Sequence, residues 1–128
     1  MNDLTVRIIL DASSILAFTR ASLDVGEVIA EVADEPGCAF GLPVLCLAEA
    51  TRAVADTERL DLLVNHPVAL VLAPDPVSWR ALAVTYDTVG RLDAASAVLA
   101  AIDLGCDVLT AQPGLYAGLA GGGPIIAF

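Results

Sequence analysis

Short apolar segments alternate along this chain with longer segments of helical spacing, and this alternation constrains the fold more than any other feature. The segment Val6–Leu10 is apolar except for Arg7 and rich in β-branched residues, which predicts a strand buried on both faces. Further strands are predicted at 68–72, also buried, and at 108–110 and 124–128. Buried strands that alternate with helices are typical of a parallel sheet covered by helices, so we expect an α/β fold.

The helices between these strands are predicted from apolar spacing and from Pro and Gly at the boundaries. One helix follows Pro43 and carries Glu49, and another runs from Asp93 to an end at Gly105. The remaining helices are expected from about residue 24 to 35, over 57–65 and over 78–89, with a short helix or turn at 113–119. A chain of 128 residues is long enough for a sizeable core, and we expect one domain over residues 1–128.

Three carboxylates interrupt apolar segments where an ordinary core has none. Asp11 follows the first strand, Glu49 lies within an apolar helix, and Asp93 begins one. Acids in such places are costly to desolvate unless a cation meets them. If the three converge, they offer the hard oxygen ligands that magnesium and manganese prefer. Parallel sheets place ligand sites at the carboxyl ends of their strands, where both Asp11 and the segment Thr110–Gln112 are expected.

Each acid also has a purely structural interpretation that the sequence leaves open. Asp11 is followed by Ala-Ser-Ser and can form an Asx turn or cap a helix. Glu49 can form a surface ion pair with Arg52, three residues later on the same helix. Asp93 can serve only as the N-cap of its helix. The functional interpretation therefore rests on the three acids as a set.

The order and spacing of these segments resemble the successive motifs of the PIN-domain family over nearly the whole chain. The matching segments are Asp11–Ala17 after a strand, Glu49 in a Pro-led helix, Asp93–Ala97 at a helix start and Val108–Ala111. The chain is most similar in style to the small bacterial PIN proteins that include the VapC toxins of toxin and antitoxin pairs. The resemblance implies a three-layer PIN-like α/β fold, with a central, mainly parallel sheet flanked by helices. It also implies an endoribonuclease that hydrolyses RNA phosphodiester bonds with Mg²⁺ or Mn²⁺.

The resemblance further implies frequent homodimers and often a cognate antitoxin that inserts a segment at the active site. Carried over position by position, it gives three catalytic and metal-binding acids and three supporting residues: Asp11, Glu49 and Asp93, and Ser13, Thr110 and Gln112. Gln112 departs from the family pattern, because many members carry a fourth acid there. Its amide oxygen adds no negative charge, so a second metal ion is expected to bind weakly.

The charge of the chain favours a different function. All six basic residues are arginines, and 16 acids give a formal net charge of −10. Such a chain has no basic stripe to attract RNA at long range. This balance, together with Gln112, favours a PIN-like protein-binding module that is catalytically weak or inactive. Retention of the three principal acids favours the nuclease.

Two other enzyme classes fit poorly. A phosphoacceptor receiver domain also has acids at strand ends, but its pattern includes a lysine, and this chain has none. A phosphatase of the haloacid dehalogenase type has a second Asp two residues after the first, where this chain has Ser13. Neither class is retained.

The remaining features predict a cytoplasmic protein without a membrane segment. Every apolar run is interrupted before it reaches the length of a membrane span, and the first residues lack a secretory pattern. The three cysteines are odd in number and lie in apolar contexts, so buried free thiols are expected. His66 is expected in a loop, and Trp79 and Tyr116 in the core or at an interface.

Overall fold

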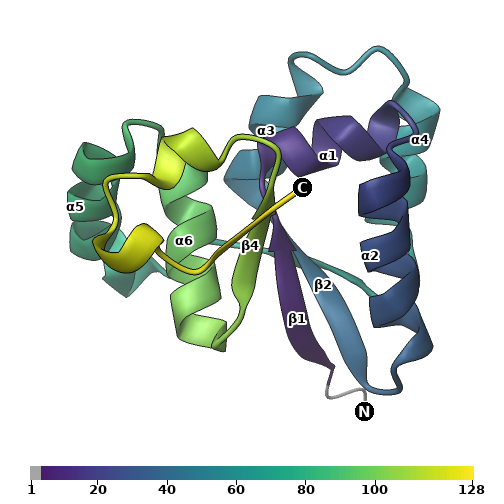
Figure 1. Cartoon of the computed structure of the whole chain (residues 1–128), viewed down its shortest axis with the longest axis horizontal. Coiled ribbons are helices and arrows are strands. Elements are labelled where there is room, and N and C mark those ends of the chain that lie inside the picture. Colours follow the sequence, from purple (N-terminus) through teal and green to yellow (C-terminus); the bar gives the residue numbers. More distant parts are fainter. Residues whose placement is uncertain (1–3) are drawn as a thin grey trace.

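A computed structural model describes residues 4–128, and its centre is a sheet of five parallel strands (Figure 1). The strands are β1 (Thr5–Leu10), β2 (Cys38–Pro43), β3 (Ala69–Leu72), β4 (Asp107–Thr110) and β5 (Ile125–Ala127). They lie in the order β3-β2-β1-β4-β5, and every neighbouring pair is parallel. From β1 the chain therefore extends the sheet in one direction as far as β3, and then crosses back to β4 and β5. The reversal point lies between β1 and β4.

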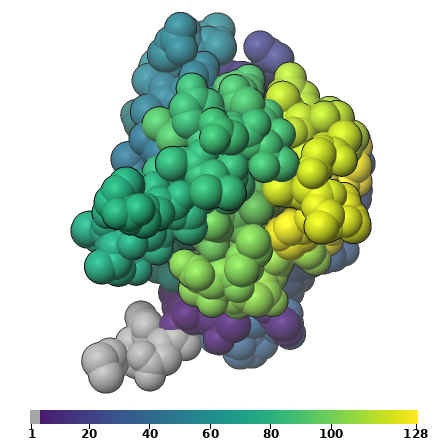
Figure 2. Space-filling model, turned by 90° about the vertical axis from the view of Figure 1, so that its left-hand side faces the viewer, coloured from purple at the N-terminus to yellow at the C-terminus, as the bar shows by residue number. Residues whose placement is uncertain are grey.

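Helices cover both faces of this sheet. They are α1 (Ala12–Thr19), α2 (Leu23–Asp34), α3 (Val44–Thr51), α4 (Thr57–Val64), α5 (Trp79–Val89) and α6 (Leu92–Leu104). Three short 3₁₀ helices are also present in the described residues, one before α5 at Pro76–Ser78 and two after β4 at Pro113–Tyr116 and Ala120–Gly122. In Figure 1, α5 and α6 lie on one side of the sheet and α2 on the other, with α1 and α3 near one end of the strands. Figure 2 looks onto the α5 and α6 side, with the C-terminal segment beside these helices. The expected three-layer α/β fold is confirmed.

The core is built from the three central strands. Ile9, Leu10, Phe40, Leu42 and Val108 are all fully buried. Residues on both faces are covered over most of these strands, so their apolar residues run together rather than alternate, as in Ile8–Leu10 of β1. Arg7, in the first half of β1, is exposed and precedes this run. Within residues 4–128, no helix is both long enough and apolar enough to cross a membrane. The three cysteines are free thiols, with Cys38 and Cys46 buried and Cys106 partly exposed, close to the expectation.

Strand β2 is absent from the elements expected from the sequence. All six of its residues are buried, and it lies between β1 and β3. Gly41 belongs here because a Cβ at this position would come within 2.7 Å of Ile9 Cδ1 and of Leu72 Cδ1. Pro43 is the last residue of the strand as well as the N-cap of α3. Gly41 and Pro43 are thus both part of a packed central strand.

Two further elements differ from the expectation. Helix α1 follows β1 directly, where only a turn or a capped helix start was considered. Strand β3 was expected to be buried, but it is an edge strand whose Val71 is 49% exposed. It pairs with β2 and contacts α4, and three of its four residues are partly buried. The other predicted elements agree with the structure to within a few residues.

Candidate functional site

Asp11 lies at the carboxyl end of β1 and is the N-cap of α1. Its Oδ1 accepts hydrogen bonds from Ser13 Oγ at 2.6 Å and from the Ser14 backbone N–H at 3.0 Å. Its Oδ2 accepts one from the Tyr116 hydroxyl at 2.7 Å. The side chain is therefore a helix cap, as its structural interpretation required. It is also 2% exposed, and in residues 4–128 no basic side chain forms an ion pair with it.

A chain of hydroxyl contacts joins the start of α1 to the loop after β4. The Ser13 hydroxyl lies 3.3 Å from Thr110 Oγ1, and Ser13 Oγ accepts a hydrogen bond from the Ala111 N–H at 2.9 Å. Thr110 Oγ1 accepts a further bond from the Gln112 N–H at 2.9 Å. The hydroxyl of Ser14 donates to the carbonyl of Leu109 in β4. These contacts hold the strand ends of β1 and β4 together, as expected for the reversal point of a parallel sheet.

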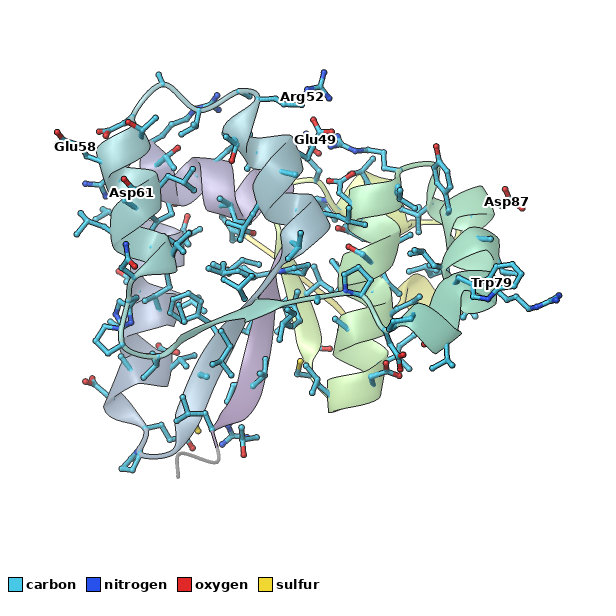
Figure 3. All side chains as sticks on the ribbon, turned by 180° about the vertical axis from the view of Figure 1, so that it is seen from behind. Glu49, Arg52, Glu58, Asp61, Trp79 and Asp87 are labelled. Atoms are coloured by element: carbon cyan, nitrogen blue, oxygen red, sulfur yellow. The ribbon has the colours of Figure 1, made fainter. Side chains whose placement is uncertain are left out.

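Glu49 lies on α3 and is partly exposed. Its two carboxylate oxygens are 3.2 and 3.3 Å from Arg52 Nη1, so the expected ion pair between residues three apart on the helix is formed. Figure 3 shows both side chains close together at one end of the molecule, well away from Trp79 and Asp87 on α5. The Arg52 side chain is 77% exposed and the Glu49 side chain 35% exposed. Exposed pairs of this kind contribute little to stability, so the Glu49 carboxylate remains available for other contacts.

Asp93 is in the first turn of α6, and the N-cap is Arg91 rather than Asp93. The expectation that Asp93 caps the helix is therefore wrong, although a negative charge near a helix N-terminus is favourable. The backbone of Arg91 is extended, and its side chain turns back to Asp93. Nε and Nη2 each donate to one carboxylate oxygen of Asp93 at 3.1 Å. This bidentate contact raises the pKa of Arg91 above its ordinary value.

The same guanidinium also faces the second acid. Arg91 Nη2 lies 3.9 Å from Glu49 Oε2, so one cation joins α3 to the start of α6. The side chain of Asp93 is only 10% exposed, whereas that of Arg91 is 37% exposed. The negative charges of Glu49 and Asp11 raise the pKa of Arg91 further. Arg91 is thus a positive charge that contacts two of the three acids, Asp93 and Glu49.

A cavity of about 620 Å³ gathers these side chains at the carboxyl ends of β1 and β4. Five of the six residues expected from the sequence line it, namely Asp11, Ser13, Glu49, Asp93 and Gln112. The sixth, Thr110, is fully buried, and its hydroxyl contacts that of Ser13. Over residues 4–128, however, no three acidic, histidine or cysteine side chains are grouped so that they could hold a metal ion. The acids share a cavity without forming a preassembled metal site.

Sequence reasoning missed two groups that contact the acids. Arg91 and Asp93 are two residues apart, a spacing at which helical side chains do not face each other, so no pairing was expected. The extended backbone of Arg91 makes it possible. Tyr116 is buried, as expected for a core residue, but nothing in the sequence indicated its bond to Asp11, 105 positions away. Burial, with the nearby Asp11 charge, raises the pKa of the Tyr116 hydroxyl strongly, so it stays protonated and donates.

Other reactive or aromatic side chains lie outside this chemistry. Cys46 is buried beneath the site, where desolvation and the charges of Asp93 and Asp11 raise its pKa, so its thiol is not a nucleophile. His66 is in a loop, where its Nδ1 accepts from the Val68 N–H at 3.2 Å, as expected for a structural histidine. Trp79 is 60% exposed on α5 and so is not a core residue.

Comparison with known proteins adds a structural neighbour. No family model and no curated protein matches the chain. The crystal structure of PAE2754 from Pyrobaculum aerophilum is similar, with a TM-score of 0.67 and 17% sequence identity. The match covers 98% of this chain and 91% of the other. At this identity the likeness supports the fold and says nothing about the reaction.

Proposed function

We propose that this chain is an endoribonuclease of the PIN type that hydrolyses RNA phosphodiester bonds with Mg²⁺ or Mn²⁺. The observation that carries the proposal is the setting of Asp11. This carboxylate is buried, has no basic partner among the described residues, and lines one cavity with Glu49 and Asp93. A desolvated carboxylate compensated only by hydrogen bonds gains from a nearby cation.

The residues of the cavity suit such a cation in kind. Carboxylate oxygens of Asp11, Glu49 and Asp93 would hold it, with the amide oxygen of Gln112 as a neutral supporting group. All are hard oxygen donors, and the cavity contains no thiolate or imidazole that would favour a softer metal. When bound, the ion supplies positive charge that stabilises the scissile phosphate and makes an attacking water more acidic.

The chain's own residues define the rest of the chemistry. The Ser13 hydroxyl donates to Asp11 and accepts from the Ala111 N–H, so the Asp11 carboxylate is held in one orientation. Arg20 and Arg91 line the same cavity and provide the charge to hold RNA phosphates. A site carboxylate then accepts the proton that water loses as it attacks phosphorus. Gln112 leaves this set one charge short of the family pattern, so we expect slow cleavage.

Metal binding and cleavage test this proposal together. Titration of the purified protein with Mn²⁺ in a calorimeter should show saturable binding, and the Asp11→Asn, Asp93→Asn double variant should lose it. A panel of single-stranded RNAs should be cleaved slowly at low ionic strength, and faster by Gln112→Asp, because an added carboxylate strengthens the ligand set. Equal Mn²⁺ binding by the parent and the double variant would reject the site.

A protein-binding module without catalysis is the second candidate, and a specific contact favours it. Both oxygens of Asp93 are already bound by Arg91, and Gln112 removes a fourth charge. With a net charge of −10, a basic segment of another protein suits this chain better than RNA does. If Mn²⁺ binds but neither the parent nor Gln112→Asp cleaves any RNA, this second function replaces the first.

The proposal extends to partners and location. As the toxin of a toxin and antitoxin pair, the chain would act in the cytoplasm, form a homodimer and be inhibited by a cognate antitoxin. The net charge of −10 supports a partner with a basic segment. Co-expression with the product of the adjacent open reading frame, followed by size-exclusion chromatography, tests for both the antitoxin complex and the dimer.

A further inference from the structure

One arginine contacts two of the acids that the proposed function assigns to a metal ion. Arg91 donates two hydrogen bonds to Asp93 and lies 3.9 Å from Glu49. Its pKa is raised by the hydrogen bonds to Asp93, and also by the charges of Glu49 and Asp11. A single guanidinium therefore neutralises two of the three carboxylates that would hold a divalent cation, Asp93 and Glu49.

We propose that Arg91 is an internal counter-ion that competes with the metal and must leave Asp93 before the metal site can form. The proposal rests on the proposed function, because it concerns how that site is controlled. Three acids line one cavity, yet no metal-binding group is present among residues 4–128.

The geometry makes the competition direct. Nε and Nη2 of Arg91 contact both Asp93 oxygens, so the face that a metal would share with Glu49 is covered by the guanidinium. The Asp93 side of this pair is nearly buried, so solvent screens it less than it screens the exposed Arg52–Glu49 pair. By contrast, Arg52 contacts Glu49 alone through an exposed side chain and leaves Asp93 and Asp11 uncovered. The two arginines carry the same charge but differ in what they block.

The connection before α6 allows the guanidinium to move. Gly90 ends α5 in the left-handed region with φ of 84°, and Arg91 follows as the only other residue between the two helices. Arg91 is partly exposed and joined to the site only through its long side chain, so a change of rotamer releases it without unfolding α6. The released guanidinium would remain at the cavity mouth, within reach of a bound phosphate.

If Arg91 competes with the metal, the apparent metal affinity equals the intrinsic affinity multiplied by the fraction of molecules in which Arg91 has left Asp93. Arg91→Gln should therefore bind Mn²⁺ at least about tenfold more tightly than the parent, within the usual range of coupling between two ligands. Arg91→Lys should lie between them, since a lysine keeps the charge but cannot form the bidentate contact. The measurement is Mn²⁺ titration of the full chain by calorimetry, with the melting temperature in chelator recorded for each variant.

Arg52→Gln is the matched control, because it removes the same charge beside the same site. Its gain in Mn²⁺ affinity should not exceed about threefold, as exposed pairs are weakly coupled. If Arg52→Gln gains as much as Arg91→Gln, the effect is general electrostatics and the counter-ion role is rejected. If the parent binds Mn²⁺ and Arg91→Gln binds it equally or more weakly, the inference fails while the proposed function stands. If no variant binds Mn²⁺, both fail.

Discussion

The buried carboxylate of Asp11 depends on the hydroxyl of Tyr116 for one of its three hydrogen bonds. Both side chains are almost fully buried, so loss of the donor leaves an oxygen of a buried anion without a partner. We expect Tyr116→Phe to lower the free energy of unfolding by about 1 to 3 kcal/mol at neutral pH. Urea denaturation of both proteins in chelator measures this difference, and equal stability would show that water replaces the hydroxyl.

The pH dependence of this pair follows from the raised pKa of Tyr116. The hydroxyl keeps its proton in the folded state, while in the unfolded chain it ionises near its ordinary pKa of about 10. Above about pH 10 the unfolded state binds fewer protons than the folded state. The stabilisation from the Tyr116 hydroxyl is therefore fully present below about pH 10 and is lost as the pH rises above this value. The stability difference between the parent and Tyr116→Phe should therefore shrink above about pH 10. Urea titrations at a series of alkaline pH values check this, and a constant difference contradicts it.

Single residues also show where sequence reasoning reached its limit. Asp11, Glu49 and Asp93 were identifiable because a carboxylate in an apolar segment is unusual on its own. Their contacts with Arg91 and Tyr116 were not, because these depend on a backbone angle and on a pairing across the fold. The candidate acids could be predicted from the sequence, whereas the cation that contacts Asp93 and Glu49 could not.

Among the strands, β2 has a glycine at a closely packed position. A Cβ at Gly41 would meet Ile9 Cδ1 and Leu72 Cδ1 at 2.7 Å, and all three residues belong to neighbouring strands. We expect Gly41→Ala to destabilise the protein by about 1 to 3 kcal/mol, as overpacking of a core does. Chemical denaturation gives the value.

Gly26 provides the comparison within the same chain. It lies inside α2, and a Cβ there would meet nothing within 4 Å. Gly26→Ala should raise the free energy of unfolding by about 0.5 to 1 kcal/mol, because alanine has the higher helix propensity. If both substitutions shift stability in the same direction, the packing argument for β2 is incorrect.

The same strand explains which parts of the fold the sequence reveals. Runs such as Ile8–Leu10 are uniformly apolar and identify themselves as buried strands. The sequence of β2, Cys-Ala-Phe-Gly-Leu-Pro, contains two residues that usually mark turns, and only the neighbouring Ile9 and Leu72 explain the glycine. Helix α1 is similarly obscured by two serines, which have low helix propensity but bond to Asp11 and β4. Local patterns failed where tertiary packing decided the structure.

At the scale of the whole molecule, the six arginines are unevenly distributed. Arg20 and Arg91 line the cavity, and Arg52 pairs with Glu49 beside it, so half of the basic residues lie at the candidate site. The surface elsewhere is dominated by acids, including Glu58, Asp61 and Asp87 (Figure 3). Long-range attraction of RNA is therefore weak, and binding has to come from a few short-range contacts at this one end of the molecule.

This distribution predicts a shallow salt dependence for RNA binding, which the proposed function requires. When the logarithm of the binding constant is plotted against the logarithm of the salt concentration, counter-ion release gives a slope of about −0.7 per phosphate contact for a single strand. Two or three arginines should therefore give a slope no steeper than about −2. Arg20→Gln should reduce that magnitude by about 0.7 and weaken binding similarly for every sequence, since phosphate contacts do not read bases. Fluorescence anisotropy of a labelled single-stranded RNA, in chelator and over a range of salt concentrations, measures the slope.

Arg80→Gln in α5 is the control. The Arg80 guanidinium stacks on the Trp79 ring, 4.6 Å from its centroid, and Arg80 does not line the cavity. An equal change of slope in both variants would mean that RNA binds non-specifically to the surface and that the cavity is not the RNA-binding site.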